Sequence, residues 1–162
     1  MSTDFIVRGL IQSDINELAE IFQRSIREVA SRDYRPAQVE AWTRFAEETS
    51  TWEQRMQSRE VWVAECDGRP IGFIQLDPPD HIDLTYVHPD FQRRGVATAL
   101  LAKTEAWARK NGGAILRVEA SITSRPFFAA CGFETIAPQI VTARGEDFLN
   151  YRMQKRLRMA GN

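Results

Sequence analysis

The sequence from Ile82 to Ala97, IDLTYVHPDFQRRGVA, decides how the rest of the chain is organised. Its first part is rich in β-branched and aromatic residues, which favour a strand over 82–87. His88-Pro89 ends that strand, and the basic loop Gln92-Arg93-Arg94 leads through Gly95 into a helical pattern. Such a junction brings unpaired backbone N–H groups and the positive end of a helix dipole together. The stretch therefore predicts an anion site, and phosphate is the usual anion there.

Two common phosphate-binding motifs are absent from this loop. It has neither the Lys-Ser/Thr ending of a P-loop nor the GxGxxG fingerprint of dinucleotide-binding folds. Gly95 has no Cβ, so the backbone there can approach a ligand closely, and Ala97 keeps the next contact small. The alternative interpretation is a solvated basic turn that caps a helix and binds nothing.

Length and composition favour a single domain over residues 1–162 with room for a sizeable core. Hydrophobic residues make up 43% and charged residues 27%, and a net charge of -1 provides no strong field to recruit nucleic acid or an anionic membrane. No apolar run approaches the roughly 20 residues that span a bilayer, and the first residues lack a signal-peptide pattern. We therefore expect a cytoplasmic protein without nucleic-acid or membrane partners.

The two cysteines, Cys66 and Cys131, form neither a metal-ligand spacing nor a disulfide framework. We therefore expect no metal site. Cys131 lies in a tight Ala-Ala-Cys-Gly-Phe turn and could act as a nucleophile, but a buried reduced thiol is the favoured interpretation.

Apolar spacing and turn residues predict a mixture of helices and strands. Asp67-Gly68 between two apolar runs is typical of an antiparallel hairpin. Strands are expected over 5–10, 61–66, 71–76, 82–87, 114–120, 133–143 and 146–155, and helices from 13 or 14, from 36, and over 51–58, 95–111 and 124–130.

This order predicts an α+β/α/β fold with a mixed, mostly antiparallel central sheet of about six to seven strands flanked by helices. The helix after Gly95 is a crossover that places the strand over 114–120 parallel to the central strand. On the central strand, His81, Asp83 and Thr85 should share one face because side chains alternate.

QRRGVA resembles the Gln/Arg-x-x-Gly-x-Gly/Ala signature of the GNAT superfamily of acyl-CoA-dependent N-acyltransferases, and VHPDF before it looks like the same family. RPFFAACGF, over 125–133, is similar to the family's helix and Gly-Phe turn. The resemblance covers 61–133 well and the two ends more loosely, and it implies a GNAT-like fold. In that family the loop's amides hold the pyrophosphate of coenzyme A. The resemblance assigns this role to Gln92, Arg93, Arg94, Gly95, Val96, Ala97 and Thr98.

In the resembled family the two parallel strands part, and the pantetheine arm of the cofactor lies between them. This assigns the main chains of Tyr86 and Val87 to the arm. It also places the acyl group near the first half of the central strand and the end of the next strand, at Glu119 to Ser121. Ser121 stands where the family often has an asparagine that touches the cofactor. Phe127 and Phe128 would form apolar walls for the pantetheine, although a purely structural role explains them equally.

Acyl transfer to an amine needs an unprotonated nucleophile, a polarised carbonyl and a proton for the leaving thiolate. The resemblance places His81 where many members have a glutamate that acts as general base. A histidine can take up a proton near neutral pH, directly or through a water, and Asp83 could orient it or bind a cationic amine. The alternatives are that His81 is an exposed residue without a role, or that His88, beyond the strand, is the base.

This chain departs from the family where most members have a tyrosine that protonates the thiolate. Phe128 occupies that position and has no proton to give. Either the thiolate leaves unassisted, or another hydroxyl such as Ser121 or Tyr34 replaces the tyrosine. Tyr34 is also the candidate for binding the acceptor substrate. Further candidates for that site are the aromatic Trp42 and Trp62 and the carboxylates of Glu119 and Asp147.

The resemblance implies an N-acetyltransferase that moves an acetyl group from acetyl-CoA to a primary amine by direct attack in a ternary complex. An alternative is a non-catalytic acyl-CoA-binding sensor or regulatory module, favoured by the missing tyrosine and disfavoured by the pair of His81 and Asp83. A third is a dimerisation domain whose basic loop binds no cofactor. Because the family often pairs subunits through its outer strands, a homodimer is possible.

Overall fold

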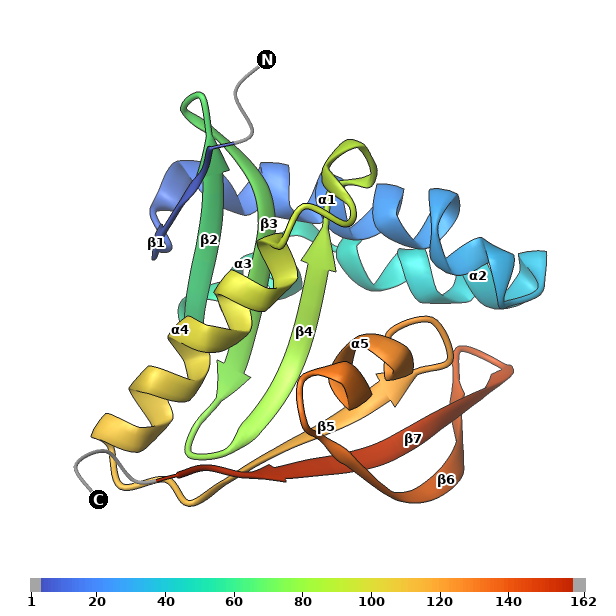
Figure 1. Ribbon diagram of the computed structural model, residues 1–162. Coiled ribbons are helices and arrows are strands. Elements are labelled where there is room, and N and C mark those ends of the chain that lie inside the picture. The colour runs from blue at the N-terminus through green and yellow to red at the C-terminus, as the bar shows by residue number, and fades with distance from the viewer. Residues whose placement is uncertain (1–3, 159–162) are drawn as a thin grey trace.

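A seven-stranded mixed sheet lies at the centre of the part of the chain that the structure, a computed structural model, describes, residues 4–158 (Figure 1). The strand order is β1-β2-β3-β4-β5-β7-β6. Within these residues β4 and β5 run parallel, and every other neighbouring pair is antiparallel. The prediction of a mixed, mostly antiparallel sheet flanked by helices is confirmed.

The strands are β1 (Ile6–Gly9), β2 (Glu60–Cys66), β3 (Arg69–Asp77), β4 (His81–Val87), β5 (Ile115–Ser121), β6 (Glu134–Ala143) and β7 (Glu146–Arg156). The α-helices are α1 (Ile15–Glu28), α2 (Pro36–Thr43), α3 (Thr49–Gln57), α4 (Val96–Lys110) and α5 (Arg125–Ala130). The described residues also contain four short 3-10 helices: η1 (Gln12–Asp14), η2 (Ala30–Arg32), η3 (Arg44–Ala46) and η4 (Pro89–Phe91).

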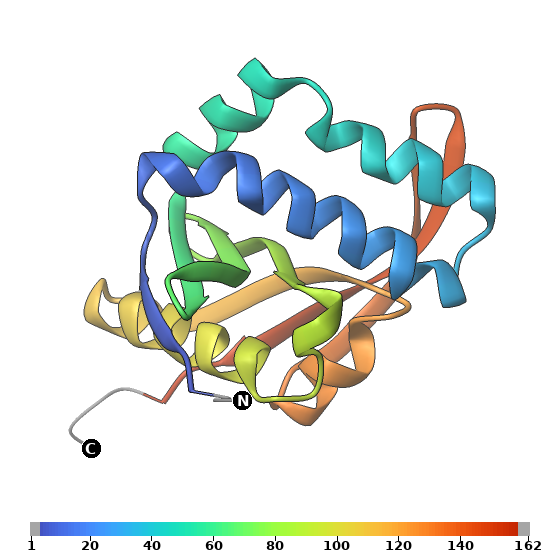
Figure 2. The same ribbon diagram turned by 90° about the horizontal axis from the view of Figure 1, so that it is seen from above.

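Helices cover both faces of the sheet, with α1, α2 and α3 on one side and α4 and α5 on the other (Figures 1 and 2). On α1 the apolar residues Leu18, Phe22 and Ile26 recur every four positions, so they form one buried stripe. This stripe packs in one core with Trp52 of α3, and the second core, under α4 and α5, includes Leu100. The sheet therefore separates two cores.

Two hairpins have the turn chemistry that their sequences predict. Asp67 and Gly68 both have positive φ, 52° and 78°, and so do Arg144 and Gly145, at 50° and 80°. Two successive residues of positive φ match the right-handed twist of the flanking strands. The turn at 67–68 joins β2 to β3, and the turn at 144–145 joins β6 to β7.

A β-bulge in β4 changes which of its side chains face which core. Gln75 of β3 pairs with Leu84, but the next residue, Leu76, pairs with Ile82, so Asp83 is an extra residue in β4. As a result Ile82 lies in the core under α4, whereas Leu84 lies in the core under α1 and α3.

The bulge makes one prediction from strict alternation wrong. Thr85 was expected on the same face as His81 and Asp83, but it pairs with Ile74, a residue of the core under α4. Asp83 contacts Arg55 of α3 on the opposite face. The extra residue shifts every later side chain of β4 by one position.

The parallel strands β4 and β5 part after their first residues. In the described part of the chain they pair at His81 with Arg117 and at Ile82 with Val118, and no further toward Val87. Figure 1 shows the two strands close at the start of β4 and apart at its end, where the loop to α4 begins. None of the helices within residues 4–158 is both long and apolar enough to cross a membrane.

Candidate active site

The loop between β4 and α4 has the geometry of an anion site. Arg93 and Gly95 have positive φ, 59° and 80°, and both are exposed together with Arg94. A Cβ on Gly95 would meet no atom within 4 Å, so a ligand can reach the backbone. The N–H of Ala99 donates to the oxygen of Gly95 at 3.0 Å, and the amides between them have no helical acceptor.

Two side-chain contacts, of Gln92 with Val87 and of Phe91 with Arg94, stabilise the conformation of this loop. The side-chain Nε2 of Gln92 donates to the carbonyl oxygen of Val87 at 2.8 Å, which ties the loop to the end of β4. The guanidinium of Arg94 lies 5.3 Å from the centre of the Phe91 ring. Gln92 therefore positions the loop, and its side-chain amide nitrogen is already engaged.

Tyr86 and Val87 present no polar side chain to the space between the parted strands. The ring of Tyr86 contacts Phe22 at 4.7 Å between centroids, in the core under α1. Burial raises the pKa of the Tyr86 phenol, so this hydroxyl is a poor acid. Val87 is buried in the other core, which leaves the main chain as the part that a ligand could use.

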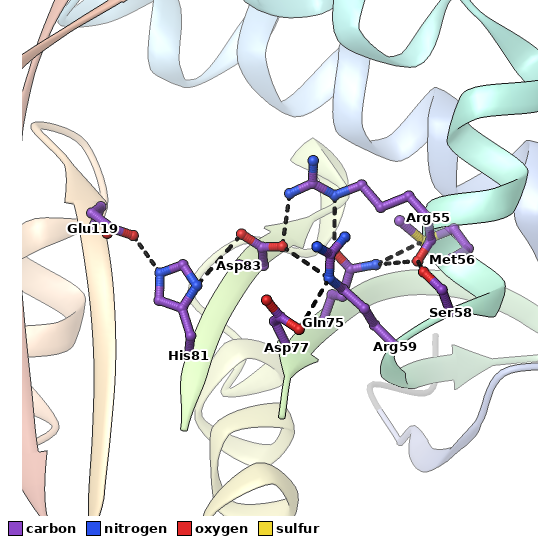
Figure 3. Close-up of polar contacts among 9 residues, drawn as sticks. All are labelled: Arg55, Met56, Ser58, Arg59, Gln75, Asp77, His81, Asp83 and Glu119. Carbon is purple, nitrogen blue, oxygen red and sulfur yellow. Dashed lines mark hydrogen bonds and ion pairs between the residues drawn. The ribbon is translucent and has the colours of Figure 1, made fainter. Parts of the chain in front are cut away.

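His81 lies between two carboxylates (Figure 3). Its Nε2 forms a hydrogen bond with Oε2 of Glu119, and its Nδ1 is 3.8 Å from Oδ1 of Asp83. Because His81 pairs with Arg117 in parallel register, Glu119 lies two residues further along β5, on the same face. Sequence reasoning named Glu119 only as a possible carboxylate for the amine and missed its contact with His81.

Asp83 is held by cationic side chains from the end of α3 and just beyond it (Figure 3). Its Oδ2 accepts a hydrogen bond from Nη2 of Arg55 at 2.7 Å and lies 3.5 Å from Nε of Arg59. Arg55 in turn donates through Nε to Oε1 of Gln75 at 3.3 Å. Two guanidinium groups balance the charge of Asp83, which therefore faces His81 as a fixed carboxylate and is poorly placed to attract a cationic amine.

A cavity of about 300 Å³ lies beside Asp83 and Glu119, the two carboxylates that flank His81, between α1, α2 and the strands β4, β5 and β7. Asp83, Glu119 and Arg55 are part of its wall, together with Ser121 and Asn150. The remainder is largely aromatic, from Phe22, Tyr34, Trp42, Phe45, Tyr86 and Phe148. The predicted aromatic candidates Tyr34 and Trp42 are thus brought together here.

Two other candidates for the acceptor site lie elsewhere. Trp62 belongs to the core under α4, where its ring centre is 6.2 Å from that of Trp107. Asp147 is exposed in the β6–β7 hairpin and accepts a hydrogen bond from Thr142 at 2.6 Å. Their expected place in the acceptor site is wrong, because strand order and turn position direct them away from the cavity.

The hydroxyl of Tyr34 joins two strands. It accepts from the N–H of Ile122 at 2.9 Å and donates to the oxygen of Leu149 at 3.1 Å. Burial raises the pKa of this phenol. Tyr34 can therefore face a substrate with its ring, while its hydroxyl proton is already committed.

The remaining residues predicted to touch the cofactor lie around the end of β5. Ser121 Oγ donates to Oγ of Ser124 at 3.0 Å and accepts from the N–H of Ser124 at 3.0 Å. Phe128 is 2% exposed and packs on Phe133, with ring centres 5.2 Å apart. Phe127 is only partly buried, so its ring is the more accessible of the two.

His88 is held outside the cavity. Its Nε2 is 2.8 Å from Nη1 of Arg24, and the N–H of Asp90 donates to its Nδ1 at 3.1 Å. Burial, with the nearby charge of Arg24, lowers the pKa of His88. These contacts give His88 a structural role, whereas His81 is connected to the cavity through Asp83 and Glu119, which are part of its wall.

The lowered pKa of His88 predicts a loss of stability in mild acid. Between the folded pKa and the unfolded value of about 6.5, the unfolded chain binds more protons than the folded one. The free energy of unfolding should therefore fall as pH drops through 6.5. We expect urea unfolding of the His88→Gln variant to lose less stability than the parent between pH 7.5 and 5.5. An identical pH dependence in both proteins would contradict this account.

The sequence and the fold both match known acetyltransferases. Residues 30–155 match the family model described as an acetyltransferase (GNAT) domain. The chain is 38% identical over 151 residues to the uncharacterized N-acetyltransferase YafP of Escherichia coli (strain K12), covering 91% of this chain and 93% of that protein.

Two solved structures share the fold. A GCN5-related N-acetyltransferase from Rhodopseudomonas palustris has a TM-score of 0.92 at 36% identity, covering 94% of this chain and 95% of that one. The PaiA N-acetyltransferase from Thermoplasma acidophilum, solved in complex with coenzyme A, has a TM-score of 0.78 at 20% identity, covering 94% and 99% of the two chains. The residues matched by the family model, 30–155, include the loop before α4 and the strands β4 and β5.

Proposed function

The chain belongs to the GNAT acetyltransferase family, and from this premise we propose that it transfers an acetyl group from acetyl-CoA to a primary amine by direct attack in a ternary complex. The observation that carries the proposal is the arrangement along β4. At its end lies an exposed loop suited to an anion, and at its start lies a histidine between two carboxylates. The strands part between these two points.

The loop fits the diphosphate of coenzyme A. The backbone at Gly95 is open, the first amides of α4 lack helical acceptors, and Arg93 and Arg94 are exposed beside them. PaiA, with the same fold, is in complex with coenzyme A. When bound, acetyl-CoA supplies a thioester, whose acyl carbon is open to attack by an amine. The residues proposed to hold it are Tyr86 and Val87 through their main chains, the loop over 92–98, Ser121 and Phe127. The predicted contact of Phe128 is not proposed, because this ring is 2% exposed and supports Phe127 from the core.

His81 is the proposed general base. If Glu119 accepts the Nε2 proton of neutral His81, the lone pair lies on Nδ1, which takes the proton of the amine directly or through a water. The carboxylates of Glu119 and Asp83 then stabilise the imidazolium. The amine nitrogen forms its bond to the acyl carbon as the carbon–sulfur bond breaks.

The thiolate is proposed to leave without a protein acid. Phe128 has no acidic proton. The hydroxyl of Tyr34 already donates a hydrogen bond to the carbonyl oxygen of Leu149, and that of Ser121 donates one to Oγ of Ser124. A thiol of pKa about 8.5 is a tolerable leaving group without help. The same lack of an acid is the observation that favours a non-catalytic acyl-CoA sensor as the second candidate.

Glu119→Gln should lower both kcat and kcat/KM about tenfold. The imidazolium of His81 loses an adjacent negative charge, while the glutamine keeps the size of the side chain. Steady-state rates between pH 5.5 and 9 measure both effects. Glu134→Gln, the same change on exposed β6, is the control and should leave the pH–rate profile unchanged. A Glu119→Gln profile identical to that of the parent would argue against the pairing.

Two measurements on the same protein separate the enzyme from the sensor. Calorimetry with acetyl-CoA measures binding, and the release of free thiol over a panel of amines measures turnover. Binding with amine-dependent thiol release supports the enzyme. Binding without release from any amine supports the sensor, and no binding would overturn the assignment of the loop.

We further propose that residues 1–162 act as a single N-acyltransferase domain in the cytoplasm, without nucleic-acid, membrane or metal partners. A homodimer is compatible with the outermost strand, β6, which exposes Ile136 at 50% and Ile140 at 62%. Exposed apolar residues on an edge strand favour association with another surface.

A further inference from the structure

We propose that the acceptor is a small monoamine that carries an aromatic ring on a short chain, an arylalkylamine. This inference rests on the proposed N-acetyltransferase function and names the substrate class for the same cavity. It is carried by the aromatic rings in the wall of the cavity, by the way its charges are paired, and by a buried oxygen of Asn150 that has no hydrogen-bond partner within residues 4–158.

Aromatic rings in mutual contact form much of the cavity wall, which also includes the aliphatic residues Leu84, Val141 and Leu149. Tyr34 and Trp42 have ring centres 5.3 Å apart, and Phe148 lies 6.1 Å and 6.2 Å from them. Trp42 continues to Tyr86 at 6.4 Å. Rings in edge and tilted contact offer both faces and edges to a further ring. These rings are suited to an aromatic group more than to a flexible chain of methylene groups.

The cavity wall has one carboxylate that no guanidinium balances, because neutral His81 leaves the charge of Glu119 in place, so the wall provides for one ammonium group and not for two. Asp83 is neutralised by Arg55 and Arg59, whereas Glu119 is hydrogen-bonded to His81. Both carboxylates lie at the same end, next to the proposed base. Arg144, from the tip of the β6–β7 hairpin, adds a positive charge to the wall. A polyamine would bring a second ammonium group to a wall that has no second carboxylate of this kind among the described residues.

Asn150 lines the cavity, and its side-chain oxygen is buried behind the wall. The residue lies opposite Ser121 in the register of β5 and β7. Its Oδ1 has no hydrogen-bond partner among the described residues. A rotation of the Asn150 side chain would bring this oxygen to the cavity, where an N–H of the acceptor amine would satisfy it.

The size of the cavity favours a single small molecule. About 300 Å³ is at the low end of the range for small-molecule pockets. The side chain of Tyr34 closes one side, because its hydroxyl holds together the ends of β5 and β7. A ring with a two-carbon arm suits this space better than a segment of peptide.

A panel of acceptors at saturating acetyl-CoA tests the proposal. We expect kcat/KM for 2-phenylethylamine to exceed the values for 2-cyclohexylethylamine, spermidine and a lysine-containing peptide by about tenfold or more. The cyclohexyl compound has the same reach without the aromatic ring, so it isolates ring recognition. Higher kcat/KM for spermidine or the peptide would overturn the proposal and leave the proposed function standing. No thiol release from any amine would overturn both.

Phe148→Ala provides the matching variant. We expect KM for 2-phenylethylamine to rise about tenfold, while KM for propylamine and the Kd for acetyl-CoA stay unchanged. Phe148→Leu, which keeps apolar bulk, separates loss of the ring from loss of packing, and it should also raise KM. Phe5→Ala, a partly buried ring packed on the other core, is the control. Equal effects of Phe148→Ala on both amines would overturn the proposal.

Discussion

Replacing His81 by alanine is expected to lower kcat about 10²- to 10⁴-fold at neutral pH, the range for loss of a general base. The affinity for acetyl-CoA should stay the same, because the loop before α4 lies at the other end of β4. Calorimetry measures that affinity, and thiol release with a saturating amine measures kcat. Raising the pH should partly restore the rate, since more of the amine is then unprotonated without help.

His88→Gln is the control for this variant. It changes the other histidine of the chain, which is held by Arg24 and Asp90 outside the cavity, and it should keep kcat within about threefold of the parent, below the range for loss of a general base. A pH–rate profile of His81→Ala that matches the parent would remove His81 as the base. The non-catalytic interpretation would then gain support if acetyl-CoA still bound.

Gly95→Asp is expected to weaken acetyl-CoA binding about 100-fold or more. The φ of 80° at this residue strains any side chain, and a carboxylate would face the diphosphate that the loop is proposed to hold. Gly95→Ala separates the two causes, because it brings the strain without the charge and should weaken binding less. Calorimetric titration of both variants with acetyl-CoA gives the comparison.

Gly112→Asp is a matched control at the opposite end of α4. Gly112 has a φ of 81°, and a Cβ there would also meet no atom within 4 Å. The backbone strain and the added charge are therefore similar, but the site lies far along the helix from the loop. Its acetyl-CoA affinity should equal that of the parent. Unchanged affinity of Gly95→Asp would mean that the loop does not bind the cofactor.

Features with local causes could be predicted from the sequence. The turn at Asp67-Gly68 needs two residues of positive φ, and an Asp-Gly dipeptide is typical of such a turn. The helix after Gly95 and the helix opened by Pro36 begin where glycine and proline place them. The loop before α4, which we propose binds an anion, could be described in the same way, because its residues are consecutive.

Features that depend on distant segments could not be predicted. The bulge at Asp83 is visible only through its register with β3, and it moved Thr85 to the other face. Arg55 reaches Asp83 from a helix that precedes β4 by a whole hairpin. Glu119 meets His81 only because β4 and β5 pair for two residues before they part. A single sequence contains no local signal for such contacts.

The length of β4 sets the distance between the proposed base and the loop before α4. One continuous strand of seven residues, His81–Val87, carries the proposed base at its first residue and is joined at its last residue to that loop through Gln92. At about 3.3 Å per residue the strand separates the two by roughly 20 Å, and its hydrogen bonds to β3 keep that separation fixed. If the loop holds the diphosphate as proposed, an acyl donor must match this span to reach both ends, and the proposed site would select its donor by length.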